Sequence, residues 1–257
     1  MKNAFTIAGK ELRSAFVSPI AYVVLTGFLL LGGWFFFNLL NRFNFLVQLY
    51  MGFRSPEVQM RLNLNEMVVA PLLGNLSVVL IILIPVITMR SFAEEKRQGT
   101  YELLLTSPLS ITEIVLGKFL GVVAFLVLML GLTAIYPAIL LIWGNPEIGI
   151  ILSGYLGLFL LAVSFATVGL LTSSFTDNQI VAAVSCLIVL LLLYVISWPA
   201  ETAGATLAAV LKYLSVTEHF AEMVKGVVET KDLIYFGSLI VGTLYLTHRS
   251  VESVRWR

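Results

Sequence analysis

Residues 68–89 read VVAPLLGNLSVVLIILIPVITM, and residues 90–109 continue as RSFAEEKRQGTYELLLTSPL. The first stretch contains no Asp, Glu, Lys, Arg or His, and it is as long as the ~20 apolar residues that an α-helix needs to cross the hydrocarbon core of a bilayer. The second stretch is the densest charged run in the chain. Together they predict a transmembrane helix that leaves the membrane near Met89 and continues into water.

The composition of the whole chain agrees with a membrane protein. Of its 257 residues, 59% are hydrophobic and 12% are charged, and the mean hydropathy is +0.96, whereas soluble domains are about 45–50% apolar and about 25% charged. A net charge of +1 gives no basic field that would attract a nucleic acid. One cysteine and two histidines are too few for a zinc or haem site. We therefore expect no bound metal and no nucleic-acid partner, and we expect Cys186 to be a small packing residue.

Six apolar stretches are candidates for membrane spans, approximately Ile20–Leu40, Val68–Met89, Phe119–Trp143, Ile148–Ser173, Ile180–Trp198 and Leu233–Thr247, the last being the shortest. Six spans put both chain ends on the same side of the membrane. That side collects more of the Lys and Arg residues than the other side, which favours cytoplasmic termini by the positive-inside rule. The fold class that follows is an all-α membrane protein, with residues 1–257 forming one transmembrane domain.

Two segments outside the spans have apolar residues at helical spacing. Residues 2–17 predict an amphipathic helix lying along the cytoplasmic surface, with a frayed polar tail as the alternative. The outer connection, residues 199–232, carries two apolar sets that can form short re-entrant helices in the outer interface or a solvated amphipathic hairpin. In this connection His219, like His248 nearer the C-terminus, is expected to be an interfacial polar residue and not a ligand or proton carrier.

Several local signals predict where helices begin. Ser110 followed by Glu113, and Thr176 followed by Gln179, read as capping boxes that open the third and fifth spans. Such a box places a hydroxyl at the N-cap and a carboxylate or amide three residues later.

The interiors of the predicted spans contain no Asp, Glu, Lys, Arg or His. Proteins that move ions along their own helices usually retain such a residue, and an intramembrane hydrolase needs a base beside its nucleophile. The absence argues against both classes. Pro85 and Pro137 are expected to kink the second and third spans.

The charged run between the second and third spans divides into two parts. Residues 94–97 extend the second span, Gly99 can end this extension, and Thr100 can cap a new short helix. This second helix is strongly apolar before Pro108 stops it, because it contains Tyr101, Leu103, Leu104 and Leu105. A short apolar helix outside the membrane is either covered by a partner protein or packs its leucines on the membrane surface.

Residues 84–109, IPVITMRSFAEEKRQGTYELLLTSPL, followed by IVLGKF at residues 114–119, resemble the permease subunits of ABC-2 type exporters, most closely the gliding-motility-associated branch. Further segments carry the same resemblance: Lys10-Glu11-Leu12-Arg13 with Ser18-Pro19-Ile20, SSFTDNQI at 173–180, and GVVE at 226–229 ahead of DLIYF at 232–236. Tyr101 departs from the pattern, since many relatives have a smaller aliphatic residue at this position.

The resemblance implies a six-span permease in a bacterial inner membrane, working beside a second permease copy or a related membrane subunit. Two copies of an ABC ATPase would bind on the cytoplasmic side, and an auxiliary extracytoplasmic subunit can accompany them. ATP and Mg would be bound by the ATPase, and this chain would bind no cofactor. The resemblance further implies a coupling region at 90–109 and a smaller contact at 176–178, with coupling residues Glu94, Glu95, Lys96, Arg97, Gly99, Thr100, Tyr101, Glu102, Leu103, Leu104, Pro108, Thr176, Asp177 and Asn178.

No G-x-x-x-x-G-K-[ST] phosphate loop occurs in the sequence. We therefore expect the chain not to be an enzyme, and ATP hydrolysis to belong to a partner subunit. The predicted function is that of the transmembrane half of an ATP-driven exporter. Two other classes are the alternatives: a secondary transporter or channel, and a non-transporting membrane scaffold for a motility or envelope machine.

Overall fold

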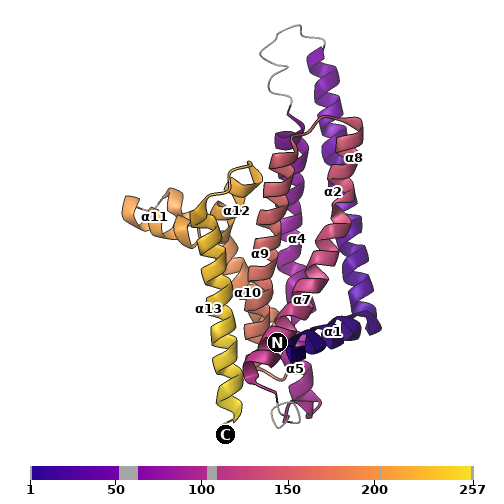
Figure 1. Ribbon diagram of the computed structural model, residues 1–257. Coiled ribbons are helices and arrows are strands. Elements are labelled where there is room, and N and C mark those ends of the chain that lie inside the picture. The colour runs from indigo at the N-terminus through magenta and orange to yellow at the C-terminus, as the bar shows by residue number, and fades with distance from the viewer. Residues whose placement is uncertain (1, 52–62, 103–108, 203, 256–257) are drawn as a thin grey trace.

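The computed structural model describes residues 2–51, 63–102, 109–202 and 204–255, and within these residues it contains helices and no strand (Figure 1). The elements, in chain order, are α1 (Lys2–Val17), α2 (Pro19–Met51), η1 (Asn65–Val69), α4 (Ala70–Thr88), α5 (Arg90–Arg97), α7 (Ile111–Thr133), α8 (Ile135–Trp143), α9 (Ile148–Phe175), α10 (Gln179–Val195), η2 (Trp198–Glu201), α11 (Ala205–Leu214), α12 (Val216–Val224) and α13 (Thr230–Arg255). The all-α prediction is confirmed for the described part of the chain.

Five helical stretches among the described residues are long and apolar enough to cross a membrane. They are Pro19–Leu49, Asn65–Arg97, Ile111–Trp143, Ile148–Phe175 and Gln179–Ala200, and each contains one of the first five predicted spans. The sixth predicted span falls within α13, which packs along α9 (Figure 1) but does not meet the same criterion of length and hydropathy. The described residues therefore give five candidate spans, and the sixth span stays a prediction.

Helix α9 is the centre of the bundle. It contacts α4, α7, α10, α12 and α13, and its residues from Leu161 to Leu170 are buried without interruption. Gly169 lies against Thr88 of α4 so closely that a Cβ atom would overlap the threonine side chain. Small residues allow helix backbones to approach in this way, and α9 thereby holds the other helices in contact with one another.

The helix starts agree only in part with the predicted caps. Ser110 and Glu113 form the expected capping box at the start of α7. The predicted box at Thr176 is wrong, because α9 continues to Phe175, beyond the predicted end of the fourth span. The short turn that remains places the cap on Asn178, whose side chain accepts hydrogen bonds from the backbone N–H groups of Ile180 and Val181.

The two prolines behave differently. Helix α4 continues through Pro85, whereas the third predicted span is divided at Ala134 into α7 and α8. Pro137 lacks the N–H group that would bond the carbonyl four residues earlier, at Thr133. The Tyr155 hydroxyl of α9 donates to that carbonyl at 2.9 Å, so the break leaves no orphaned acceptor there.

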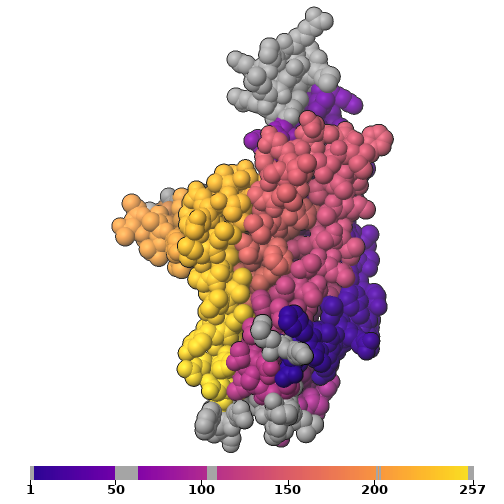
Figure 2. Space-filling view, viewed as in Figure 1, coloured from indigo at the N-terminus to yellow at the C-terminus, as the bar shows by residue number. Residues whose placement is uncertain are grey.

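Helix α1 crosses one end of the bundle at a steep angle to the long helices and lies on its surface (Figures 1 and 2). Its main contact is with α7, where Gly117 and Gly121 occupy successive turns. A Cβ atom on Gly117 would lie 2.6 Å from the Cβ of Ile7, and one on Gly121 would lie 2.7 Å from the Cβ of Glu11. The helix predicted over residues 2–17 is thus present and packs directly against the α7 backbone.

The connection 199–232 contains the two expected short helices. Helix α12 is partly buried against α9, while α11 has no buried residue and projects from the side of the bundle (Figures 1 and 2).

Replacing Gly117 with Ala should lower the stability of the chain. The added methyl group must displace Ile7 or the Ala4 carbonyl, and overpacking of this kind costs about 1–3 kcal/mol. Gly131→Ala in the same helix is the matched control, because nothing lies within 4 Å of its added Cβ, and it should leave stability equal or slightly higher. The thermal unfolding midpoints of the purified variants in detergent give the comparison. Equal midpoints for both variants would contradict the close α1–α7 contact.

Candidate functional site

The predicted coupling region begins with α5, which follows α4 after the single residue Met89. Met89 provides no side-chain cap for α5. Ser173 of α9 does so instead: its Oγ accepts hydrogen bonds from the backbone N–H groups of Phe92 at 3.0 Å and Ala93 at 3.1 Å, and it donates to the Met89 carbonyl at 3.0 Å. The start of α5 is therefore fixed by another helix, through groups that its own sequence leaves unsatisfied.

A buried lysine joins three helices at this end of the bundle. Lys118 of α7 is only 1% exposed, and its Nζ lies 2.9 Å from Glu11 Oε1 of α1 and 2.8 Å from Glu95 Oε1 of α5. The same ammonium lies 5.1 Å from the ring centroid of Phe92. Because a buried charge is costly without its partners, these contacts hold α1, α5 and α7 together.

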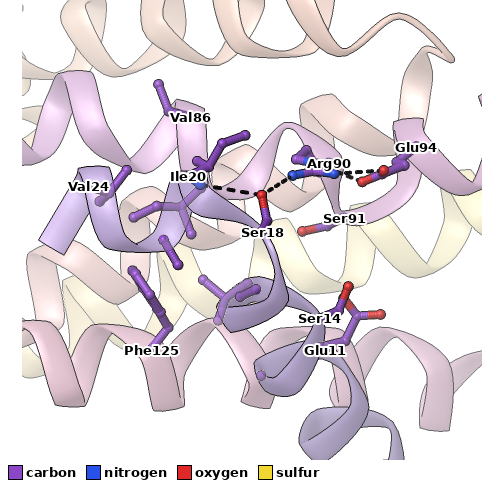
Figure 3. Close-up of a pocket in the computed structure, with 15 residues that line it drawn as sticks. Glu11, Ser14, Ser18, Ile20, Val24, Val86, Arg90, Ser91, Glu94 and Phe125 are labelled. Carbon is purple, nitrogen blue, oxygen red and sulfur yellow. Dashed lines mark hydrogen bonds and ion pairs between the residues drawn. The ribbon is translucent and has the colours of Figure 1, made fainter.

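An arginine makes the second charged connection. Figure 3 shows Arg90 bound to Glu94 and to Ser18, the residue between α1 and α2. Its Nε and Nη2 lie 2.7 and 2.8 Å from the two Glu94 oxygens, and Nη1 lies 2.8 Å from Ser18 Oγ. Ser18 Oγ also accepts a hydrogen bond from the backbone N–H of Ile20, at the start of α2, whose first residue is Pro19. Arg90 thus ties α5 to the junction of the first two helices.

A cavity of about 100 Å³ lies between these helices (Figure 3). Glu11, Ser14, Arg90 and Glu94 provide its polar wall, and Val24, Val86 and Phe125 are among its apolar residues. The charged groups in its wall already form ion pairs within the chain. Among the described residues, no group of three or more His, Cys, Asp or Glu is placed to hold a metal ion.

The tip of α5 ends where the sequence predicts. Gly99 has a φ of +70°, a conformation that favours glycine, and residues 100–102 are helical again. Tyr101 does not face outward: it is 4% exposed, and the Lys96 ammonium lies 5.2 Å from its ring centroid. Burial, together with the nearby Glu95 carboxylate, raises the pKa of Tyr101 to about 12.

The two predicted contact segments lie side by side. The Lys96 ammonium donates a hydrogen bond to the carbonyl of Ser174, directly before the 176–178 turn. Ser174 Oγ in turn lies 2.8 Å from Ser250 Oγ of α13. The segments 90–102 and 173–178, far apart in the sequence, therefore form one surface at the end of the bundle.

The predicted site residues separate into three groups by exposure. The exposed ones are Arg97, Gly99, Thr100, Glu102, Asp177 and Asn178, the intermediate ones are Glu94, Glu95, Lys96 and Thr176, and Tyr101 is buried. Leu103, Leu104 and Pro108 lie outside the described residues. Only the first group is placed for unobstructed contact with another protein, whereas Glu94 and Glu95 form ion pairs within the chain.

Sequence reasoning did not assign a role to Lys118, Glu11 or Ser173. A partial signal existed for Lys118, because a lysine directly before an apolar span needs either water or a carboxylate nearby. No sequence signal identifies Ser173, since its hydroxyl caps a helix distant in the chain.

Replacing Lys118 with Met should destabilise the chain by up to about 3 kcal/mol, the low end of the range for breaking a buried ion pair, because the side chains of Glu11 and Glu95 are partly exposed. Adding Glu11→Gln and Glu95→Gln should restore part of the loss, since the two unpaired charges are then removed. Lys10→Met, at an exposed position of α1, is the control and should change little. Thermal unfolding in detergent measures all three, and a Lys118→Met variant as stable as the control would refute the role of this ion pair.

One of the comparisons with known proteins identifies a family for this chain. The sequence model of a family described as ABC-2 family transporter protein matches residues 47–246, which is well over half of the chain and includes α5 and the 176–178 turn. No curated protein matches the chain at a significant level. Because this match covers most of the chain, the chain belongs to the ABC-2 family of transporter proteins.

Proposed function

We propose that this chain is the transmembrane permease subunit of an ATP-driven exporter, and that it forms half of the translocation pathway while a separate ATPase subunit supplies the energy. Family membership and five apolar helices support a membrane transport role. The sequence contains no G-x-x-x-x-G-K-[ST] phosphate loop, which is the usual means of cradling the phosphates of ATP. The proposal therefore assigns the binding and hydrolysis of ATP to a subunit on another chain.

The observation that carries the proposal is the surface formed by the tip of α5 and the 176–178 turn. Its exposed residues include charges of both signs, Arg97, Glu102 and Asp177, at the end of the apolar bundle. The helix behind it is attached to α9 through Ser173, to α7 through Lys118 and to the junction of α1 and α2 through Ser18. A displacement of the tip would therefore move these helices together, which is what ATP-driven rocking of a transmembrane half requires.

The remaining features of the assembly are part of the proposal. Helix α13 serves as the sixth span, both termini are cytoplasmic, and the membrane is the bacterial inner membrane. Two permease copies, or this chain and a related subunit, share two ATPase copies, and an auxiliary extracytoplasmic subunit can join them. We place the second subunit against α10, where large apolar residues such as Ile188 and Leu192 are exposed and must be covered by lipid or by protein. The similarity to the gliding-motility-associated branch rests on the sequence motifs and remains a prediction.

Reversing the charge of Arg97 or Glu102 should weaken association with the ATPase roughly ten-fold or more, because charges at an interface select the partner and are repelled when reversed. The measurement is the affinity between detergent-purified chain and an ABC ATPase encoded beside its gene. Lys225→Glu is the matched control, since Lys225 is exposed and follows α12, away from the α5 tip.

Three outcomes distinguish the functions. Weakened association in Arg97→Glu and Glu102→Lys, with normal unfolding midpoints and an unaffected control, supports the permease assignment. A chain that never retains an ATPase in mild detergent would instead indicate a secondary transporter or channel. A chain that retains the ATPase, but whose ATPase rate ignores every candidate substrate, would indicate a non-transporting scaffold.

A further inference from the structure

His219 is enclosed where the outer connection meets the last helix. It belongs to α12, is 5% exposed, and packs its ring against Tyr235 of α13 with centroids 4.1 Å apart. Its Nδ1 lies 2.7 Å from Asp232 Oδ1 of α13, and its Nε2 lies 3.0 Å from the carbonyl oxygen of Tyr213 of α11. Tertiary contacts therefore bury this histidine within the protein, while its place at the membrane interface stays a prediction.

The geometry fixes the number of protons on this pair. A carbonyl oxygen only accepts hydrogen bonds, so Nε2 must carry a proton. The 2.7 Å contact between Nδ1 and the Asp232 carboxyl requires a second proton, whether it resides on the imidazole or on the acid. Without that proton, two lone pairs would face each other across a hydrogen-bond distance. The closed arrangement thus contains one proton more than a neutral histidine beside an ionised aspartate.

No other charge compensates Asp232. Its side chain is fully buried, and Oδ2 has no hydrogen-bond partner among the described residues. Loss of the shared proton would leave an ionised carboxylate in a site where neither water nor a cation reaches it, which is strongly unfavourable. The carboxylate could recover hydration only if the α11–α12 hairpin moved away from α13.

The groups around the pair do not supply the missing charge. The tyrosines of the adjacent elements are Tyr213 on α11, Tyr235 and Tyr245 on α13, Tyr194 on α10 and Tyr155 on α9, and α4 has no titratable residue. The charged residues of the hairpin and its surroundings are Lys212, Glu218, Glu222, Lys225, Glu229 and Lys231, and of these Lys231 is paired with Glu222 and Glu229. The proton between His219 and Asp232 is the group that balances the buried carboxylate.

We propose that His219 and Asp232 form a proton-binding site that clasps the α11–α12 hairpin to α13, and that release of the proton opens the clasp. The closed state binds the proton and the open state releases it, so acid strengthens the clasp and alkaline pH weakens it. The hairpin lies away from α5 along the bundle (Figure 1). The site would therefore make the attachment of the α11–α12 hairpin depend on pH, at a distance from the proposed ATPase contact. The proposal does not depend on an ATPase partner.

The protonation state can be measured directly, because the sequence contains only two histidines. Nitrogen-15 NMR of histidine-labelled full-length chain in lipid nanodiscs, with His248→Gln to assign the signals, should show His219 with a protonated Nε2 and one further proton that is lost as pH rises. A spectrum in which Nε2 of His219 carries no proton at any pH would overturn the proposal.

Hydrogen exchange tests the movement of the hairpin. After correction for intrinsic rates, amides of residues 216–224 should exchange roughly ten- to a hundred-fold faster once the pair has lost its proton, because a hydrogen bond to a charged group shifts a local opening equilibrium by about that factor. Exchange that stays constant through the titration would overturn the proposal.

Asp232→Asn gives the sharpest variant. The amide can donate to the Nδ1 lone pair of a neutral His219, so this clasp needs no additional proton and its exchange should be independent of pH. Glu229→Gln is the matched control, because Glu229 is an exposed residue that pairs with Lys231. This variant should retain the pH dependence of the unmodified chain. A pH dependence that persists unchanged in Asp232→Asn would exclude the pair as its cause. The measurements on the unmodified chain decide the proposal if this variant fails to fold.

Discussion

The ammonium of Lys118 lies where almost no water reaches it, and carboxylates from α1 and α5 neutralise its charge. Such a charge is tolerated only while its partners remain in place. The position of α1 across the bundle, the position of α5 beyond α4, and the start of α7 are therefore set together. Arg90 adds the junction of α1 and α2 to the same unit, so that the polar end of the molecule cannot rearrange one helix at a time.

Helix α9 connects the two regions to which we assign a function. At one end Ser173 of this helix holds the start of α5, and nearer the other end Gly157 lies under Met223 of α12, where a Cβ atom would be 2.9 Å from the Met223 Cβ. Because packed interiors have little free volume, a shift of α9 cannot be absorbed locally. The coupling surface and the histidine clasp thus contact the same rigid element, although their chemistry differs.

Much of the fold is predictable from the sequence because its signals are local. Five apolar runs coincide with candidate spans, Gly99 ends α5, and Ser110 caps α7. The sixth run is less clear because α13 also contains polar and charged residues at both ends. Thr176 and Asn178 can both cap a helix, and the end of α9, which no local signal marks, decides between them.

The site is less predictable because its contacts join distant segments. The apolar and charged pattern marks the α5 tip as a contact surface, but it does not reveal that Glu95 is paired with Lys118 or that Tyr101 is buried. Likewise, the apolar spacing around His219 predicts a short helix, but only the fold brings Asp232 to its ring. Periodicity reports which face of a helix is apolar, and it carries no information on which partner meets a buried charge.

The cap that Ser173 provides has a consequence for how this surface can evolve. The start of α5 is fixed by a side chain of α9, by backbone groups of α5 and by the inward-facing Arg90 and Glu95, and the exposed side chains of the tip take no part in these contacts. The exposed positions 97, 98, 100 and 102 are thus open to drift without loss of their location, whereas position 99 favours glycine because of its φ of +70°. Related chains could retain one scaffold while changing the residues that recognise a motor, and gene duplication could then yield transporters that do not exchange their motors.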